Sequence, residues 1–316
     1  MRVLITGAAG MLGQKLSAAL RSQPFDRVTI DALDLFDVVA TTVVDPVDSL
    51  LVGDLAEVGV AEDLIARQPD VVFHLAGVVS GEAEANFAKG TRVNLDATRA
   101  LFDAIRQSEF VPRVVFTSSI AVFGAPFPDV IGDDFHLTPL TSYGTQKMIG
   151  EALLADYSRR GFMDGVGVRL PTITVRPGAP NAAASGFFSG IIREPLNGQE
   201  ALLPVPRDVR HPHASPRSAI GFLLHAAQLD TVALGARRNL TMPSISVTVG
   251  EQIEALARVA GNEAVGLIRE SADEAVANIV AGWPQTFDAR RARDLGFVCE
   301  SSYDEIIAAY VADDLV

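Results

Sequence analysis

Cysteine is nearly missing from this sequence of 316 residues, with Cys299 the single example. One cysteine excludes an internal disulfide and a metal site built from cysteines. Long apolar runs are missing as well, since none approaches the roughly 18 residues of a membrane span. Acidic residues outnumber basic ones, and the net charge of −13 disfavours binding of nucleic acid. We therefore expect a cytoplasmic protein with no nucleic-acid partner and no membrane partner.

The first thirteen residues combine a short apolar strand, a glycine-rich turn and the start of a helix. In such a unit Gly7 permits the tight turn, Gly10 lets the backbone approach a pyrophosphate, and Gly13 lets the helix pack close to the strand. The helix N-terminus, at Met11 and Leu12, offers free N–H groups to phosphates. This pattern predicts a dinucleotide-binding site. A glycine-rich loop without a ligand is the alternative.

Three aspartates lie in or near the second predicted strand, residues 27–37. A carboxylate at the end of this strand accepts hydrogen bonds from the adenosine ribose and repels a 2′-phosphate. It therefore selects NAD over NADP. Asp37 is the favoured candidate because a turn follows it, and Asp31 and Asp34 are its rivals.

Strands and helices alternate over the rest of the first half of the chain. We predict strands over 50–55, 70–77, 113–119 and 165–175, and helices over 60–67, 91–107, 141–160, 218–229, 247–261, 273–282 and 301–314. Alternation of this kind predicts an α/β fold, a Rossmann doubly wound parallel sheet. We expect residues 1–175 to form the NAD-binding domain, to which a segment around 205–230 returns. We expect residues 176–316 to form mainly a smaller, interleaved C-terminal substrate-binding subdomain.

Tyr143 and Lys147 are four residues apart, so on a helix they share one face. A phenol with a pKa of ~10 is a poor base at neutral pH, but a cation ~5 Å away lowers that pKa by roughly 2 units. Ser119 ends the fifth predicted strand and can bind a substrate hydroxyl. The three residues predict removal of a hydroxyl proton while a hydride leaves the same carbon for a nicotinamide.

Several motifs together resemble the extended short-chain dehydrogenases/reductases, the group that includes nucleotide-sugar epimerases and dehydratases. They are Thr6-Gly7-x-x-Gly10-x-x-Gly13, Gly53-Asp54-Leu55, His74-Leu75-Ala76-Gly77, Asn94, Ser118-Ser119, Tyr143-x-x-x-Lys147 and Arg176-Pro177-Gly178. The resemblance covers nearly the whole chain and implies catalysis by Ser119, Tyr143 and Lys147 with NAD. It also implies cofactor contacts from Asp54, Leu55, Leu75, Ala76, Asn94, Tyr143, Lys147, Pro171 and Thr172. His74 lies in an apolar strand and is expected to be a hydrogen-bonded core histidine.

The chain departs from nucleotide-sugar enzymes where substrate binds. It has Phe123 in place of their Val-Tyr-Gly tyrosine, and residues 172–178 and 213–218 differ from their Asn-x-Tyr-Gly-Pro and Val-x-Asp-Asp segments. Segments 78–84, 123–128, 180–189 and 210–217 instead resemble family members that oxidise carbon 2 of a short sugar acid, in sugar-acid catabolism. The expected substrate-binding residues are Ser80, Ser119, Tyr143, Asn181, Ser185, Arg210, His211, His213 and Arg217. Guanidinium groups bind carboxylates bidentately.

Two alternative functions remain open at this stage. One is a nucleotide-sugar epimerase or dehydratase with tightly held NAD, and the other is a non-catalytic NAD-binding protein. His211-x-His213 has no third ligand in view, so we expect no metal site. The resemblance also implies a homodimer that pairs the helices near 91–107 and 141–160.

Overall fold

The computed structural model describes residues 1–22, 25, 29–41, 45, 48–178 and 185–315. These residues form two compact units. The first comprises Met1–Val122, Pro139–Arg169 and Ile220–Leu240, and the second comprises Phe123–Thr138, Leu170–Ala219 and Thr241–Val316.

These bounds differ from the predicted division at three places, one of which is residues 170–175, which belong to the second unit. Residues 123–138 belong to the second unit because β6 (Ile131–Gly132) pairs with β14 (Phe287–Asp288). Residues 210–214 also belong there, since they form β10 (Arg210–Ala214), which pairs with strands of that unit. The segment that returns to the first unit is Ile220–Leu240, whose end contributes a strand to the main sheet.

A seven-stranded sheet forms the centre of the first unit, in the order β11-β7-β5-β4-β1-β2-β3. Its strands are β1 (Arg2–Thr6), β2 (Ala32–Asp37), β3 (Ser49–Val52), β4 (Val71–His74), β5 (Arg113–Ser119), β7 (Asp164–Leu170) and β11 (Asn239–Thr241). β1 pairs in parallel with β2 and β4, and β4 pairs in parallel with β5. This arrangement confirms the predicted Rossmann fold.

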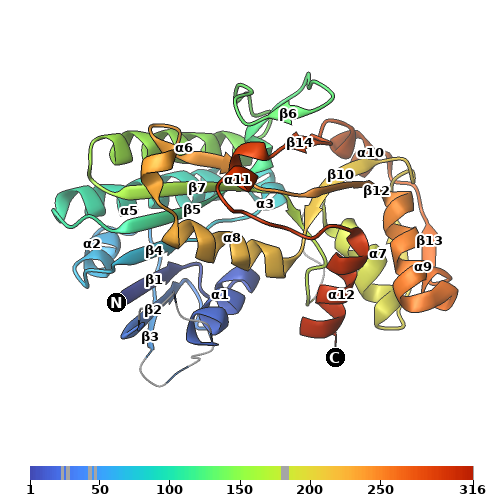
Figure 1. Cartoon of the computed structure of the whole chain (residues 1–316), viewed down its shortest axis with the longest axis horizontal. Helices are drawn as coiled ribbons and strands as arrows, with labels where there is room; N and C mark the ends of the chain where they lie inside the picture. The colour runs from blue at the N-terminus through green and yellow to red at the C-terminus, as the bar shows by residue number, and fades with distance from the viewer. Residues whose placement is uncertain (23–24, 26–28, 42–44, 46–47, 179–184, 316) are drawn as a thin grey trace. The chain divides into compact units, whose positions relative to one another are not determined.

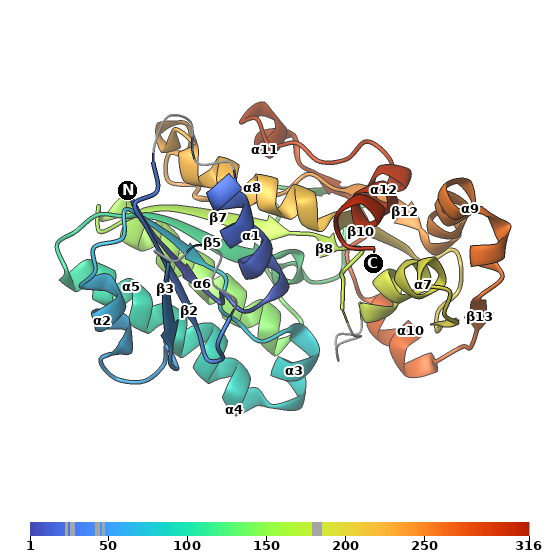
Figure 2. The same cartoon turned by 90° about the horizontal axis from the view of Figure 1, so that it is seen from below.

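Helices cover both faces of this sheet (Figure 1, Figure 2). α1 (Met11–Ser22) and α8 (Pro216–Gln228) lie on one face, while α2 (Val60–Ile65), α5 (Ala97–Gln107) and α6 (Ser142–Arg159) lie on the other. The short helices α3 (Ser80–Ala85) and α4 (Phe87–Gly90) lead into a π-helical turn, Thr91–Asp96, which precedes α5. Two 3₁₀ turns, Ile120–Val122 and Thr231–Leu234, complete the unit.

The central strands of the first unit carry apolar side chains on both faces, and these side chains form much of its core. Val3, Leu4 and Ile5 of β1 are fully buried, as are Phe73 and Phe116 on the next strands. Apolar side chains on both faces are typical of a parallel sheet that helices cover twice. The buried strands therefore hold the residues at their carboxyl ends in fixed positions.

The predicted strand over 165–175 is two strands. β7 ends at Leu170, and β8 (Thr172–Ile173) pairs with β10 and not with the main sheet. Pro171 separates the two, and proline cannot donate a ladder hydrogen bond. The chain changes sheets at this residue.

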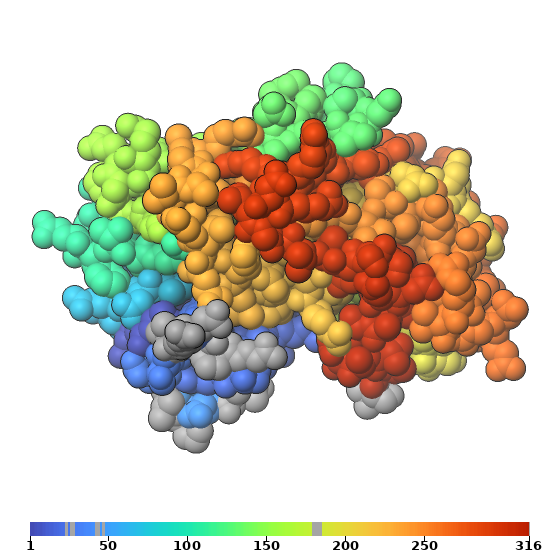
Figure 3. Space-filling model, viewed as in Figure 1, coloured from blue at the N-terminus to red at the C-terminus, as the bar shows by residue number. Residues whose placement is uncertain are grey.

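The second unit builds its own core around the sheet β12-β10-β8, in which β12 (Ile245–Thr248) runs antiparallel to β10. Its helices are α7 (Gly186–Leu196), α9 (Val249–Val265), α10 (Glu274–Ala281), α11 (Arg290–Asp294) and α12 (Tyr303–Asp313), and β9 (Ala201–Leu203) pairs with β13 (Ile268–Glu270). α7, α9 and α12 share one core that includes Phe188, Ile253 and Ile307. The orange and red segments after Thr241 form much of the visible surface of this unit (Figure 3).

No helix of the described residues combines the length and the apolar character that a membrane span needs.

Gly13→Ala is expected to lower the free energy of unfolding by about 1–3 kcal/mol, because a Cβ at this buried position would meet the Gly7 carbonyl oxygen and lie 2.7 Å from Ala8 Cα. Gly10→Ala is the matched control, since its Cβ would have no neighbour nearer than 3.4 Å. Its effect should stay within about 0.5 kcal/mol. Urea denaturation measures both variants, and equal losses would contradict the proposed close approach of α1 to β1.

Candidate active site

The glycine turn after β1 is fixed by backbone hydrogen bonds to the end of β2. The N–H groups of Gly7 and Ala8 both donate to the Phe36 carbonyl oxygen, at 2.9 and 3.1 Å. Gly7 has φ +79°, and a Cβ there would lie 2.6 Å from Ala76 N. Glycine is therefore required, both for the backbone angle and for the close approach of the loop after β4. Gly10 is exposed at the start of α1, where backbone is open to a ligand.

The three candidate aspartates have different surroundings. Asp34 is buried in β2, and the guanidinium groups of Arg2 and Arg67 hold its carboxylate at 3.1 and 2.8 Å. Asp31 precedes the strand and pairs with the N-terminal ammonium group. Asp37 ends the strand, and its carboxylate accepts a 2.9 Å hydrogen bond from Ala9 N in the glycine turn. Only Asp37 of the three lies at the carboxyl end of β2 beside that turn.

Asp54 follows β3 and carries a local partner of its own. Its carboxylate accepts from Arg92 Nη2 at 2.8 Å and from Ala56 N at 2.9 Å, and these bonds help hold the pKa of that carboxyl below its usual range against the effect of burial. Leu55 is buried next to it. After β4, Leu75 N donates to the Thr6 carbonyl oxygen at 3.0 Å, so the loop with Leu75 and Ala76 continues along β1.

Asn94 lies in the π-helical turn and ties it to two other segments. Its Oδ1 accepts from Val78 N at 2.9 Å, and its Nδ2 donates to Gln146 Oε1 at 2.8 Å. A Cβ on Gly77 would lie 3.0 Å from Asn94 Oδ1 and 3.5 Å from Lys147 Nζ. Short π-helical turns occur frequently at functional sites. Here the turn brings the Asn94 amide to the loop that follows β4.

His74 is a fully buried and hydrogen-bonded core histidine, as the sequence predicted. Its Nδ1 lies 2.7 Å from Thr6 Oγ1 and its Nε2 lies 2.9 Å from Thr98 Oγ1. Burial, assisted by the nearby charge of Lys147, lowers the pKa of His74 to about 3. The ring is therefore neutral at physiological pH.

Lys147 is buried, and its ammonium group donates a 2.9 Å hydrogen bond to the Thr117 carbonyl oxygen at the end of β5. Its Nζ lies 5.0 Å from the centre of the Phe116 ring and 5.8 Å from the centre of the Tyr143 ring. Burial lowers the pKa of Lys147 to about 8, and the Glu151 carboxylate opposes this shift. The amine is mostly protonated at pH 7.

Tyr143 and Ser119 lie together in the first unit, as predicted. Burial raises the pKa of the Tyr143 phenol, while a hydrogen bond with the Ser119 hydroxyl acts in the opposite direction. Ser119 Oγ also accepts from Ala121 N at 3.1 Å, which fixes its position at the start of the 3₁₀ turn. The protein alone therefore does not bring this phenol towards neutral pH, contrary to the simple estimate from Lys147.

A buried ion pair beneath these residues escaped the sequence analysis. The Arg169 guanidinium binds Glu151 through Nε at 2.9 Å and Nη2 at 2.7 Å, and Ser118 Oγ donates to the same carboxylate at 2.5 Å. Glu151 stands one helical turn after Lys147, so the sequence shows the spacing Tyr-x-x-x-Lys-x-x-x-Glu. The sequence does not show that Arg169 of β7 is the partner of Glu151.

His211 and His213 point from β10 into the core of the second unit, where both are buried. His211 Nε2 lies 2.6 Å from the hydroxyl of Thr172, and His213 Nε2 accepts from Gln252 Nε2 at 2.9 Å. Burial lowers the pKa of both rings, that of His211 to about 3. His213 is thus a buried, hydrogen-bonded core residue, and its contact with substrate stays a prediction. Pro171 is buried at the junction of β7 and β8.

Arg210 and Arg217 are already paired with carboxylates of the protein. Arg210 donates to Ser246 O at 2.7 Å and to Glu251 Oε2 at 3.1 Å, where Glu251 forms the capping box of α9. Arg217 is exposed and binds Asp313 bidentately, at 3.0 and 2.6 Å. Each guanidinium group that was expected to bind a substrate carboxylate is therefore already bound to a carboxylate of the protein.

The other predicted substrate residues are placed as follows. Ser80 begins α3 in the first unit, and Ser185 precedes α7 in the second, 3.4 Å from Arg176 Nη2. Asn181 lies outside the described residues. The described part of the chain contains no group of three or more histidine, cysteine, aspartate or glutamate side chains that could hold a metal ion.

Known proteins resemble this chain over its whole length. Residues 3–216 match the model of the NAD dependent epimerase/dehydratase family. D-erythronate dehydrogenase from Cupriavidus necator is 49% identical over 99% of this chain and 98% of its own, and that from Haemophilus influenzae is 39% identical over 100% of both. A crystal structure of the nucleoside-diphosphate-sugar epimerase from Agrobacterium tumefaciens is 56% identical, with a TM-score of 0.97, over 100% of this chain and 94% of that one. The resemblance predicted from the motifs is thereby confirmed.

Asp37→Ala is expected to lower the ratio of kcat/KM for NAD to that for NADP by about tenfold or more. Loss of the carboxylate removes its repulsion of the 2′-phosphate, and like charges in contact cost several kcal/mol. Steady-state kinetics with both cofactors measure the ratio. Asp31→Ala is the control, because Asp31 lies before β2 and pairs with the N-terminus. A shifted ratio in Asp31→Ala together with an unchanged ratio in Asp37→Ala would contradict the assignment of Asp37. The carboxylate that selects NAD would then be the one before β2.

Proposed function

The chain belongs to the NAD-dependent epimerase/dehydratase family, and we propose that it oxidises carbon 2 of D-erythronate with NAD. The observation that carries the proposal is the full-length likeness to two enzymes named D-erythronate dehydrogenase. The 2-hydroxy acid and NAD⁺ would give 2-dehydro-D-erythronate, NADH and one proton. Net formation of NADH distinguishes this reaction from an epimerisation.

The residues of the first unit supply the proton chemistry of this reaction. Tyr143 takes the proton of the carbon-2 hydroxyl, and Ser119 holds that hydroxyl by a hydrogen bond. Lys147 stabilises the phenolate that Tyr143 must become, because its ammonium group lies on the same face of α6. When bound, NAD would supply a nicotinamide ring that accepts the hydride and whose positive charge opposes the rise in the phenol pKa that burial causes.

The same unit offers the groups that suit NAD. Gly7, Gly10, Met11, Leu12 and Gly13 provide the turn and the helix N-terminus for the pyrophosphate. Asp37 provides the acceptor for the ribose hydroxyls, and Asp54, Leu55, Leu75, Ala76, Asn94, Tyr143 and Lys147 complete the proposed set in this unit. Pro171 and Thr172, which the family resemblance adds to the proposed set, belong to the second unit. The requirement for glycine at position 7 and the Asp37 bond to Ala9 support this assignment.

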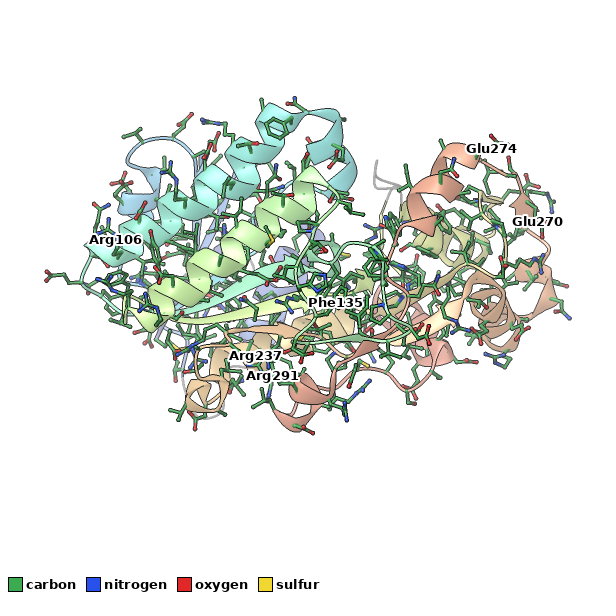
Figure 4. All side chains as sticks on the ribbon, turned by 90° about the horizontal axis from the view of Figure 1, so that it is seen from above. Arg106, Phe135, Arg237, Glu270, Glu274 and Arg291 are labelled. Carbon is green, nitrogen blue, oxygen red and sulfur yellow. The ribbon has the colours of Figure 1, made fainter. Side chains whose placement is uncertain are left out.

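We also propose a homodimer formed through α5 and α6. These helices lie side by side on one face of the sheet (Figure 4), and Tyr157 of α6 donates to Asp103 of α5 at 2.9 Å. In Figure 4 the label Arg106 marks the C-terminal end of α5. We further propose a role in sugar-acid catabolism in the cytoplasm, where NADH is reoxidised.

A nucleotide-sugar epimerase is the second candidate, favoured by the name given to the 56% identical Agrobacterium tumefaciens structure. An epimerase returns its hydride to the sugar, so it accumulates no NADH. A non-catalytic NAD-binding protein would leave the arrangement of Ser119, Tyr143 and Lys147 without use, and turnover on any substrate excludes it.

Tyr143→Phe is expected to lose about 10²–10⁴-fold in kcat, since it removes the general base but keeps the ring. Affinity for NAD should change little, as measured by fluorescence titration of NADH. Lys147→Ala should impair both turnover and cofactor binding, because it stabilises the phenolate and contacts the nicotinamide ribose. Retention of most wild-type activity by Tyr143→Phe would remove Tyr143 from the mechanism.

A parallel assay of D-erythronate, L-threonate, erythritol and a UDP-hexose with NAD tests the substrate class. We expect NADH from D-erythronate and at least tenfold lower kcat/KM for erythritol, because the polyol leaves a cation of the site unpaired. NADH formed from erythritol alone, or epimerisation of the UDP-hexose without oxidation of D-erythronate, would contradict the proposed function.

A further inference from the structure

Among the buried and half-buried arginines of the described chain, one differs from the others in its ion pairing. Nine further arginines are buried or half-buried, and each of these binds a carboxylate: Arg2, Arg21, Arg67, Arg113, Arg169, Arg193, Arg210, Arg238 and Arg291. Arg176 is also half-buried, and no described carboxylate forms an ion pair with it. Residues 179–184, which follow it, contain no aspartate or glutamate in their sequence.

The backbone of Arg176 is held from both sides. Its N–H donates to Ser189 Oγ at 3.1 Å, and its carbonyl oxygen accepts from Arg193 Nη1 at 2.8 Å. The charge of Arg193 is compensated by Glu194, 2.6 Å away. The position of Arg176 is therefore fixed by two residues of α7, while no described carboxylate compensates the charge of its own guanidinium.

Among the described residues, the side chain of Arg176 has one weak hydrogen-bond partner, Ser185 Oγ, at 3.4 Å from Nη2. Ser185 stands at the N-terminal end of α7, and its hydroxyl forms no capping hydrogen bond with the helix. Both groups thus keep hydrogen-bonding capacity towards a ligand. Burial, followed by the like charge of Arg193, lowers the pKa of Arg176. An anion at this point would relieve both effects.

We propose that Arg176, assisted by the Ser185 hydroxyl, binds the carboxylate of the substrate and selects acids over neutral compounds of the same shape. This inference rests on the proposed function for the identity of the acid. It replaces Arg210 and Arg217, whose guanidinium groups are bound to Glu251 and Asp313. A guanidinium suits the role because its fork matches the two oxygens of a carboxylate.

The test compares D-erythronate with D-erythronamide, its neutral amide, by calorimetric titration into protein saturated with NADH. Neither ligand can be oxidised in the presence of the reduced cofactor, so binding is measured without turnover. Wild type should prefer the acid. Arg176→Gln should weaken binding of the acid by roughly 30-fold or more and bring acid and amide within about threefold of each other. Arg176→Lys should fall between the two, since it keeps the charge but loses the fork.

Arg258→Gln is the matched control, because it removes an exposed arginine of the same unit that is paired with Asp304, and it should stay within about threefold of wild type. Thermal denaturation without ligand adds a second readout. Arg176→Gln should melt at or above the wild-type temperature, since it removes an uncompensated charge, whereas a structural arginine would lower it. If Arg176→Gln does not fold, its role is structural and the proposal is overturned.

The outcomes separate this inference from the proposed function. Acid binding by Arg176→Gln within threefold of wild type overturns the inference, even when wild type oxidises D-erythronate with NAD. Loss of acid preference in Arg176→Gln, together with no oxidation by wild type, supports the carboxylate site and overturns the proposed function. Binding of neither ligand by wild type overturns both.

Discussion

Burial of one ammonium group, that of Lys147, is the constraint on which the proposed catalytic end of the first unit depends. Its hydrogen bond to the Thr117 carbonyl oxygen joins α6 to the end of β5. That bond brings the tyrosine of α6 to Ser119 of β5. A buried cation needs compensation, and the Glu151 carboxylate supplies it from one helical turn away. Arg169 and Ser118 in turn hold Glu151, so the polar interior beneath the site forms one connected network.

The surroundings of Tyr143 favour the protonated phenol over the phenolate. Burial raises its pKa, and the hydrogen bond with Ser119 is the opposing contribution from the protein. The remaining stabilisation of a phenolate comes from positive charge, which Lys147 and a bound nicotinamide both provide. In the proposed mechanism, the base strength of Tyr143 is thereby linked to cofactor binding, which limits proton removal to the complex that can also accept a hydride.

Local patterns predicted the parts of the molecule that depend on spacing along the chain. The strand Arg113–Ser119 has the bounds expected from its apolar run, and the helix with Tyr143 and Lys147 lies within one residue of its predicted ends. The strand over 165–175 was wrong as one element, because the change of sheet at Pro171 is decided by the distant partner β10. Which guanidinium is free is likewise a tertiary property: Arg217 is paired by Asp313 and Arg210 by Glu251, across separations that no sequence spacing reveals. His211-x-His213 resembled a ligand-binding pair, yet both rings pack beside Phe188 in a core.

The central claim is that a hydride leaves carbon 2 of a short sugar acid for NAD. Incubation of the enzyme with NAD and D-erythronate that carries deuterium only at carbon 2, followed by mass spectrometry of the reduced cofactor, tests it most directly. The account predicts reduced cofactor with one deuterium and a 2-keto acid that has lost it. Unlabelled NADH with deuterium retained in the oxidised acid would place the reaction at another carbon and contradict the account.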